Sequence, residues 1–324
     1  MPEFIELTRP QNLPALSYPE RDARNAITKW LAGFRSENTR RAYAKELEAF
    51  AAFTKHADIN AAAAWLLRLT EHEAHNAVDL WRGEKIARGN QPATINRSMA
   101  TLNSFVTSAR RGGFTALRLE AMGEKSVPYR DTKGPGLPAY LTMLAVARNQ
   151  PDRLKASRDA AILMLAFGLA LRRAEIVALN IGDVDIEGSR LSIIGKGRAE
   201  PQFLTLTPEL KDALGGWLHY RRSSDPAAPL FIGLSRASKD GGRLSGDGVY
   251  KLIRDDIGGM AGVKARPHGL RHTAITTALD RIGGDFRKVR SFSRHSSLEI
   301  IRVYDDARED HAGQVAGILT ALTR

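Results

Sequence analysis

The chain has 324 residues, of which 43% are apolar and 26% are charged, an ordinary balance for a globular protein long enough for two domains. Its 48 Lys and Arg against 36 Asp and Glu give a net charge of +12, which favours a polyanionic partner, either nucleic acid or an anionic membrane. The lack of cysteine excludes disulfides, thiolate zinc sites and cysteine nucleophiles.

Neither a membrane span nor a cofactor is expected. The longest apolar run, residues 160–171, is too short to cross a bilayer, and the N-terminus lacks the pattern of a signal peptide, so we expect a cytoplasmic protein. His72 and His75 are three residues apart, whereas the zinc-protease motif needs a spacing of four. Gly195 and Lys196 lack the upstream glycine and the following Ser or Thr of a P-loop. We therefore expect no metal and no nucleotide.

The N-terminal part is predicted to be an irregular arm followed by a helical domain. Residues 1–20 contain four prolines and no hydrophobic period, whereas residues 21–118 have apolar residues at helical spacing. In the second of these helices, Asn38 or Thr39 is a suitable N-cap. The predicted helices span residues 22–30, 36–50, 60–69, 71–88 and 91–111.

A basic surface is predicted on this helical domain. Residues 85–119 contain no Asp or Glu but several Lys and Arg. Such a surface can lie along DNA phosphates, since each contact releases condensed counterions. The alternative is a solvated helix face that lacks acidic residues by chance. The candidate DNA-binding residues of this domain are Arg40, Arg41, Lys45, Arg97, Arg110 and Arg111.

A linker is predicted over residues 119–136, which contain scattered glycine, proline and charge without a sustained period. The following domain, residues 137–324, should combine helices with a small antiparallel β-sheet, so the fold class is mainly α. An almost wholly apolar helix over residues 157–171 should be central to the core and carry Arg172 at its C-terminal end. The other predicted elements are strands over residues 184–186, 190–194 and 202–206 and helices over residues 137–148, 208–222, 244–260 and 307–322.

Four polar residues gather in the C-terminal part of this domain. His268 and Arg271 are three residues apart, so on a helix they share a face and can converge on one anion. Nine residues after His295 stands Tyr304, whose phenol is a weak nucleophile unless a base or a positive charge stabilises the phenolate. Basic neighbours can supply that charge. Any one of these residues alone is more often structural than catalytic.

Two further segments complete an ordered set of residues. Arg172 and Arg173 end an apolar run, and Lys196 lies between glycines on the loop that joins two predicted strands. A charged residue in a glycine turn is common, so Lys196 alone indicates little. The six residue types together, however, follow the chain order Arg, Lys, His-x-x-Arg, His and Tyr. In this order the sequence resembles the tyrosine recombinase family, of the phage integrase or Xer type. Residues 39–43 and 93–97 are similar to two helix starts of that family's core-binding domain.

The resemblance implies an architecture and a role for each residue of the set. A helical core-binding domain and a mixed α+β catalytic domain would form a clamp around double-stranded DNA. The family has an acidic residue three positions after its first arginine. Glu175 stands three positions after Arg172, so the resemblance assigns the phosphate-binding role to Arg172 rather than to Arg173 and a supporting role to Glu175. Lys251 and Arg254 would be further DNA contacts. The implied catalytic residues are Arg172 and Arg271 as phosphate ligands, Lys196 as general acid, His268 as general base or phosphate donor, His295 as phosphate donor and Tyr304 as nucleophile.

The implied reaction is site-specific recombination through a 3′-phosphotyrosyl intermediate. This link conserves the energy of the phosphodiester, so no ATP is needed. The protein itself would supply the nucleophile, the charge stabilisation and the proton transfers, so no metal is expected. Repeated on two strand pairs, the reaction forms a Holliday junction and requires four protomers on two duplexes, as a homotetramer or as a heterotetramer with a related recombinase. Such a protein would be associated with the nucleoid. The C-terminal helix could dock on its own domain or on a neighbouring protomer.

The sequence departs from the family pattern at two places, and three alternative functions are also compatible with it. Ser293 and Arg294 stand where the family usually has Leu-Gly, and Ile300 and Ile301 replace a frequent Thr pair before the tyrosine. The alternatives are a type IB topoisomerase-like nicking and resealing enzyme, a non-catalytic DNA-binding protein of the same fold, and a basic membrane-surface protein. The sequence does not distinguish an integrase from a resolvase or a chromosome-dimer recombinase, and it does not specify the target DNA.

Overall fold

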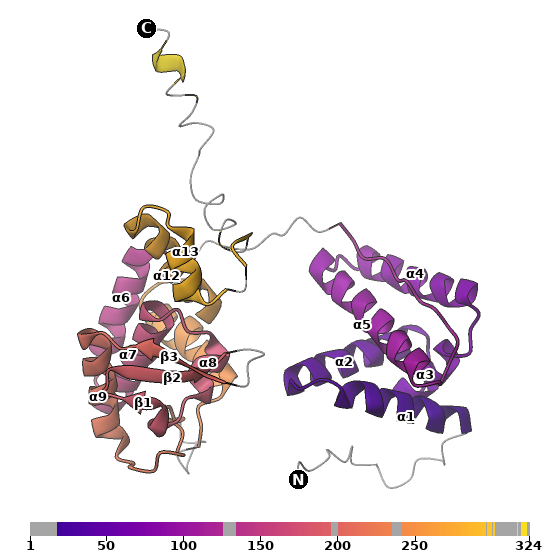
Figure 1. Ribbon diagram of the computed structural model, residues 1–324, viewed down its shortest axis with the longest axis horizontal. Coiled ribbons are helices and arrows are strands. Elements are labelled where there is room, and N and C mark those ends of the chain that lie inside the picture. Colours follow the sequence, from indigo (N-terminus) through magenta and orange to yellow (C-terminus); the bar gives the residue numbers. More distant parts are fainter. Residues whose placement is uncertain are drawn as a thin grey trace. The chain divides into compact units, whose positions relative to one another are not determined.

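The computed structural model divides the chain into two units, Met1–Tyr129 and Arg130–Arg324 (Figure 1). The predicted limits of the arm, the two domains and the linker remain predictions. No helix in the described part of the chain is both long and apolar enough to span a membrane. The structure describes residues 18–125, 134–195, 200–234, 242–295, 297–299, 301, 316 and 319–322.

The first unit is helical, as predicted, and is built around buried aromatic side chains. The Trp30 ring packs edge-on against Phe105 with centroids 5.4 Å apart, and Phe50 meets Trp81 at 5.1 Å. These four side chains are at most 3% exposed, so contacts between distant segments hold the helices together. The helices of this unit are α1 (Tyr18–Ala32), α2 (Glu37–Phe53), α3 (Ile59–Leu66), α4 (Glu71–Ala87) and α5 (Pro92–Arg111).

The start of α2 differs from the prediction. Ser36 is the N-cap, and its hydroxyl accepts the Thr39 backbone N–H at 3.4 Å. The predicted caps, Asn38 and Thr39, instead lie within the first helical turn. All three residues are good capping types, so the sequence pattern alone could not place the boundary to within two residues.

The second unit is mainly helical with one three-stranded antiparallel sheet, which confirms the expected fold class (Figure 1). Helix α7 lies at the centre of its core, with Ala161, Ile162, Leu163 and Leu165 fully buried. The helices of this unit are α6 (Leu137–Arg148), α7 (Arg153–Gly168), α8 (Arg173–Ala178), η1 (Ile181–Asp183), α9 (Pro208–Arg221), α10 (Gly246–Lys251), η2 (Leu252–Ile257), α11 (Gly258–Met260), α12 (Pro267–Arg281) and α13 (Phe286–Ser293).

The sheet has the order β1-β2-β3, with β1 at Val184–Asp185, β2 at Arg190–Ile194 and β3 at Pro201–Thr205. In its register Leu191 of β2 pairs with Val184 on one side and Leu204 on the other. The predicted strands are therefore confirmed, with small shifts of their ends. Lys196, predicted on the loop after β2, lies outside the described residues.

Two predicted helices differ in ways that shape the functional site. Helix α7 ends at Gly168 rather than at residue 171, so Arg172 follows a short loop and is not on α7. The helix predicted over residues 244–260 contains a π-helical turn, η2, between α10 and α11. The helix predicted over residues 307–322 falls mostly outside the described residues, which include only residues 316 and 319–322 of it.

Candidate active site

The loop between α7 and α8 ends at Arg172, immediately before the first residue of α8. Arg172 is the N-cap residue of α8, and its backbone N–H donates to Oε2 of Glu175 at 2.8 Å. The Nη1 atom of its guanidinium donates to Oε1 of the same carboxylate, also at 2.8 Å. One buried carboxylate therefore fixes both the backbone and the side chain of Arg172. The arginine side chain keeps 32% of its surface exposed, so it can still meet a ligand.

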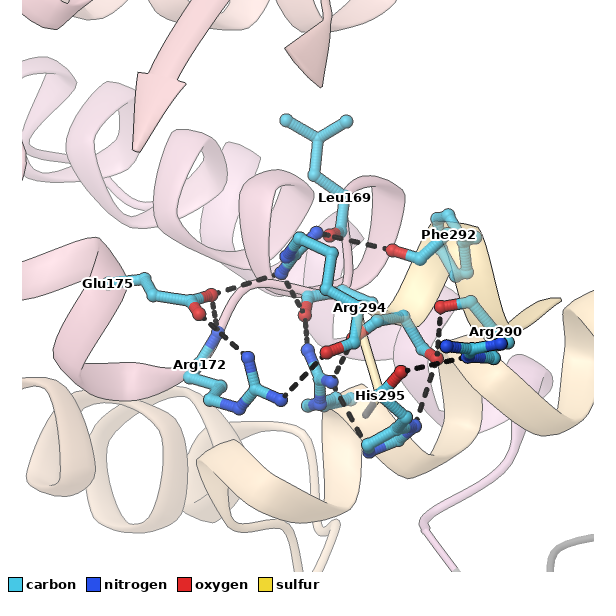
Figure 2. A network of polar contacts seen from close by, with 10 residues as sticks. Leu169, Arg172, Glu175, Arg290, Phe292, Arg294 and His295 are labelled. Atoms are coloured by element: carbon cyan, nitrogen blue, oxygen red, sulfur yellow. Dashed lines mark hydrogen bonds and ion pairs between the residues drawn. The ribbon is translucent and has the colours of Figure 1, made fainter. Parts of the chain in front are cut away.

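Arg271 connects three segments of the second unit. It lies on α12 and is only 1% exposed. Its guanidinium donates to the backbone carbonyls of Ala170 and Ser293, and its Nη2 atom lies 3.4 Å from Nε2 of His295 (Figure 2). Because a guanidinium has several donors in a rigid plane, it can hold these groups in one fixed arrangement.

His295 is oriented from both sides of its ring. Arg271 can only donate hydrogen bonds, so Nε2 of His295 is the acceptor in that contact. The ring proton is then on Nδ1, which lies 2.9 Å from Oγ of the buried Ser293. The backbone carbonyl of His295 also accepts Nε of Arg290 at 3.3 Å. These contacts hold the imidazole beside Arg271.

His268 occupies the first turn of α12 and is exposed. Its ring packs edge-on against His272 with centroids 4.2 Å apart. It also lines a pocket of about 700 Å³ together with Arg254, Lys264 and Arg266. None of the described residues that line this pocket is acidic. The pocket therefore favours an anionic ligand.

The electrostatics of the network centre on the Glu175 carboxylate. Burial alone would raise the pKa of Glu175, but the backbone N–H of Arg172 and the charges of Arg294 and Arg172 lower it below the ordinary value. The Nη2 atom of Arg294 lies 3.0 Å from Oε2 of Glu175, and both side chains are almost fully buried. Burial lowers the pKa of Arg294, and the charge of Glu175 opposes that shift.

The structure brings Arg172, Glu175, Arg271 and His295 into one network (Figure 2). His268 precedes Arg271 on the same helix, as predicted, but their convergence on one anion remains a prediction. Lys196 and Tyr304 lie outside the described residues.

Two nearby residues show how this chain departs from the family pattern. Sequence reasoning did not identify Arg294 as a member of the network, because its left-handed backbone and its distant partners leave no periodic signal. Ile301, noted as a departure, is fully buried against Ile275, Leu279 and Val289. The chain is therefore anchored in the core three residues before Tyr304.

Arg173 lies apart from this network. It is exposed, its Nη1 donates to the carbonyl of Gly246 at 3.3 Å, and it approaches Asp247 at 3.8 Å. Arg172 thus pairs with the Glu175 carboxylate whereas Arg173 pairs with Asp247, and the choice of Arg172 as the catalytic arginine remains a prediction.

The candidate DNA-binding residues differ in how firmly the protein already holds them. Arg40 donates to the carbonyl of Phe34 at 2.7 Å, and Arg97 donates to the buried Glu46 at 2.9 Å. Arg254 pairs with Asp255. Arg41 donates to Oδ1 of Asn38 at 2.7 Å. The other candidates, Lys45, Arg110, Arg111 and Lys251, are exposed, and a contact with DNA stays a prediction for all eight residues.

Comparison with known proteins gives one family. The model of the phage integrase family matches residues 140–311. Tyrosine recombinase slr0733 of Synechocystis sp. is 38% identical over 323 residues, covering 98% of this chain and 99% of the relative. Two solved structures have the same fold. A XerH site-specific recombinase bound to a palindromic difH substrate, in a post-cleavage complex, has a TM-score of 0.64 at 16% identity and covers 93% of this chain and 95% of its own. A lambda integrase tetramer bound to a Holliday junction has a TM-score of 0.64 at 14% identity, with 90% and 78% covered.

Proposed function

This chain belongs to the phage integrase family of tyrosine recombinases, and we propose that it is a site-specific DNA recombinase with Tyr304 as its nucleophile. The observation that carries the proposal is one network of polar contacts. In it Glu175 orients Arg172, and Arg271 lies beside His295 and shares the Ala170 carbonyl with Arg294, the second partner of Glu175. Several donors and an excess of positive charge suit the non-bridging oxygens of a phosphodiester.

The two arginines would stabilise the charge that develops on the phosphate. Arg172 keeps an exposed guanidinium while Glu175 orients it, and Arg271 is held by two backbone carbonyls. Donors that are already fixed in position need little reorganisation during the reaction, which makes their electrostatic stabilisation effective. This pre-organisation supports their assignment as phosphate ligands.

His295 would donate a hydrogen bond to the same phosphate. To do so it must carry a proton on Nε2, so phosphate binding would exchange the contact with Arg271 for an Nε2–H bond. Oγ of Ser293 can then donate to Nδ1, since a hydroxyl both donates and accepts. Ser293 therefore supports either tautomer of His295.

The covalent step transfers a phosphoryl group between two oxygens. Tyr304 Oη forms a bond to the scissile phosphorus, and the bond from phosphorus to the 5′ oxygen breaks. The tyrosine proton passes to His268 as general base, and Lys196 donates a proton to the leaving 5′ oxygen. The product is a 3′-phosphotyrosyl link, and attack by another strand's 5′ hydroxyl reverses the step. Because the bond energy is conserved, the reaction needs no ATP. The two arginines and the two proton-transfer groups would take the place of a metal ion.

Recombination requires this step on four strands. We expect four protomers on two duplexes and a Holliday junction between the two rounds of exchange, an arrangement supported by the lambda integrase tetramer whose fold this chain has. The helical domain, residues 21–118, and the catalytic domain, residues 137–324, would close around the DNA, at the nucleoid in the cytoplasm. Their candidate DNA contacts are Arg40, Arg41, Lys45, Arg97, Arg110, Arg111, Lys251 and Arg254.

A covalent trapping assay tests the proposed function. The full chain is incubated with a nicked duplex taken from the DNA that flanks its own coding sequence, and the products are separated under denaturing conditions. The wild type and the control Tyr220→Phe, an exposed residue of α9, should give a protein–DNA adduct, and Tyr304→Phe should give none. Binding of that duplex without an adduct would instead indicate a non-catalytic DNA-binding protein. A topoisomerase-like enzyme would form the adduct but relax supercoiled DNA as a monomer.

A further inference from the structure

We propose that Arg294 is a positioning residue that holds Arg172 and Arg271 in the geometry needed for the scissile phosphate. The proposal rests on the proposed function and adds a residue to it. Arg294 contacts Arg172 and its partner Glu175 (Figure 2), and it shares the carbonyl of Ala170 with Arg271.

The contacts of Arg294 with the first arginine run through Glu175 and through its own backbone. Its Nη2 atom donates to Oε2 of Glu175 at 3.0 Å, and the other oxygen of that carboxylate accepts Arg172 Nη1 at 2.8 Å. The backbone carbonyl of Arg294 also lies 3.5 Å from Nη2 of Arg172. Without Arg294, the Glu175 carboxylate would lose one of its two guanidinium partners and could change its position relative to Arg172.

The contacts with the second arginine run through the loop after α7. Arg294 donates from Nη2 to the carbonyl of Ala170 at 3.0 Å and from Nη1 to that of Leu169 at 2.8 Å. The carbonyl of Ala170 also accepts the guanidinium of Arg271. Two arginines from different segments therefore share one carbonyl of the loop that leads to Arg172. A change at Arg294 would move this shared acceptor.

Arg294 is also the C-cap residue that ends α13. Its φ of 57° lies in the left-handed region, which glycine adopts without strain but an arginine does not. Such a residue costs free energy and persists where the surrounding structure holds it in place, as the contacts of this side chain do. The side chain is only 4% exposed, so it cannot reach the DNA itself. Its effect must pass through the groups that it contacts.

The rate of adduct formation distinguishes a role of Arg294 in positioning the two arginines from a role in the stability of the fold alone. We compare Arg294→Met with Arg243→Met as a matched control. Arg243 also holds a loop of the second unit through several acceptors, since its guanidinium donates to the carbonyls of Val177 and Leu179 at 2.7 and 2.9 Å. Both variants should unfold more easily than the wild type. Single-turnover adduct formation is then measured on the nicked flanking duplex at saturating, fully folded protein.

The proposal predicts that Arg294→Met slows adduct formation by about 10- to 100-fold, because small displacements of catalytic groups have effects of this size. The DNA affinity should stay within about threefold, and Arg243→Met should keep the wild-type rate. Combined with Glu175→Gln, Arg294→Met should slow the reaction by much less than the product of the two single effects.

The possible outcomes test the positioning role of Arg294 and the proposed function separately. If the wild type forms the adduct and Arg294→Met forms it at the rate of Arg243→Met, Arg294 has only a structural role and the positioning proposal is wrong. Multiplicative effects of Arg294→Met and Glu175→Gln would also overturn it. If the wild type itself forms no adduct, the proposed function fails, and the positioning role falls with it.

Discussion

The Nη2 atom of Arg271 lies 3.4 Å from Nε2 of His295, although 24 positions separate the two residues in the sequence. The same guanidinium donates to the carbonyls of Ala170 and Ser293. Arg271 therefore has two tasks that can be measured separately. It joins three segments of the second unit, and it places a positive charge beside His295.

Arg271→Lys should damage both tasks. A lysine keeps the charge but lacks the planar set of donors, so adduct formation should fall by about 10²- to 10³-fold, the usual effect of losing one transition-state donor. The unpaired carbonyls should lower the free energy of unfolding by about 1–3 kcal/mol. Single-turnover cleavage and urea unfolding measure the two effects. Arg281→Lys, an exposed change on the same helix, is the control, and an Arg271→Lys variant with the wild-type cleavage rate would refute the assignment.

Ser293→Ala should slow adduct formation without changing DNA affinity. The hydroxyl of Ser293 lies 2.9 Å from Nδ1 of His295 and is the ring's partner in either tautomer. Loss of one hydrogen bond of about 1 kcal/mol corresponds to a rate reduction of about fivefold. The comparison is with Ser291→Ala, an exposed change on the same helix. Equal rates for the two variants would mean that Ser293 does not orient His295.

The Glu175 carboxylate should make stability depend on pH in the acid range. Its pKa is lowered in the folded chain despite burial, because Arg172 and Arg294 favour the charged form. A group of this kind stabilises the protein above its unfolded pKa, about 4.3, and the stabilisation is lost as the pH falls through the lower folded value.

Glu175→Gln tests this sign. At pH 7 the variant should be less stable by on the order of 3 kcal/mol, because it leaves the buried Arg294 without its counter-charge. The difference in melting temperature from the wild type should shrink steadily as the pH is lowered below about 4. A difference that grew toward acid pH would mean that burial outweighs the two arginines and that the pKa of Glu175 is raised.

The sequence predicted the elements that carry a strong hydrophobic period and missed features that depend on tertiary contacts. The apolar α7 and the strands β2 and β3 could be predicted from local patterns, whereas no periodicity was used to predict the helix that carries Arg271. The end of α7 could not, because residues 169–171 are apolar and continue the pattern although the chain leaves the helix after Gly168. Ala170 has a φ of 45°, which no periodicity indicates.

The candidate site was predictable only in part for a similar reason. The order of Arg172, His268, Arg271 and His295 could be compared with a family pattern, and Glu175 followed from its spacing to Arg172. Arg294 could not be found in this way, since its partners Leu169, Ala170 and Glu175 lie 119 to 125 positions earlier in the chain. Its importance follows from a left-handed backbone and a buried ion pair, which are properties of the folded protein.

The exposed arginines at the end of α5 should contribute to DNA affinity through phosphates. Replacing both Arg110 and Arg111 with Ala should weaken binding of the full chain to duplex DNA. The slope of log K against log salt should become shallower by about 0.9 for each phosphate that the variant no longer neutralises. Fluorescence anisotropy across a salt series measures the slope. Arg68→Ala, an exposed change outside the predicted DNA-binding residues, serves as the control. An unchanged slope for the double variant would mean that this end of α5 does not bind DNA.

Identification of the residue that carries the DNA is the decisive measurement for Tyr304 as the nucleophile. The covalent adduct is formed on the nicked duplex, digested with nuclease and trypsin, and analysed by mass spectrometry. The chain contains seven tyrosines, and we predict that the nucleotide is attached through its 3′ phosphate to the peptide of residues 303–308, which contains Tyr304. A nucleotide on any other peptide, or one attached through a 5′ phosphate, would rule out the proposed chemistry.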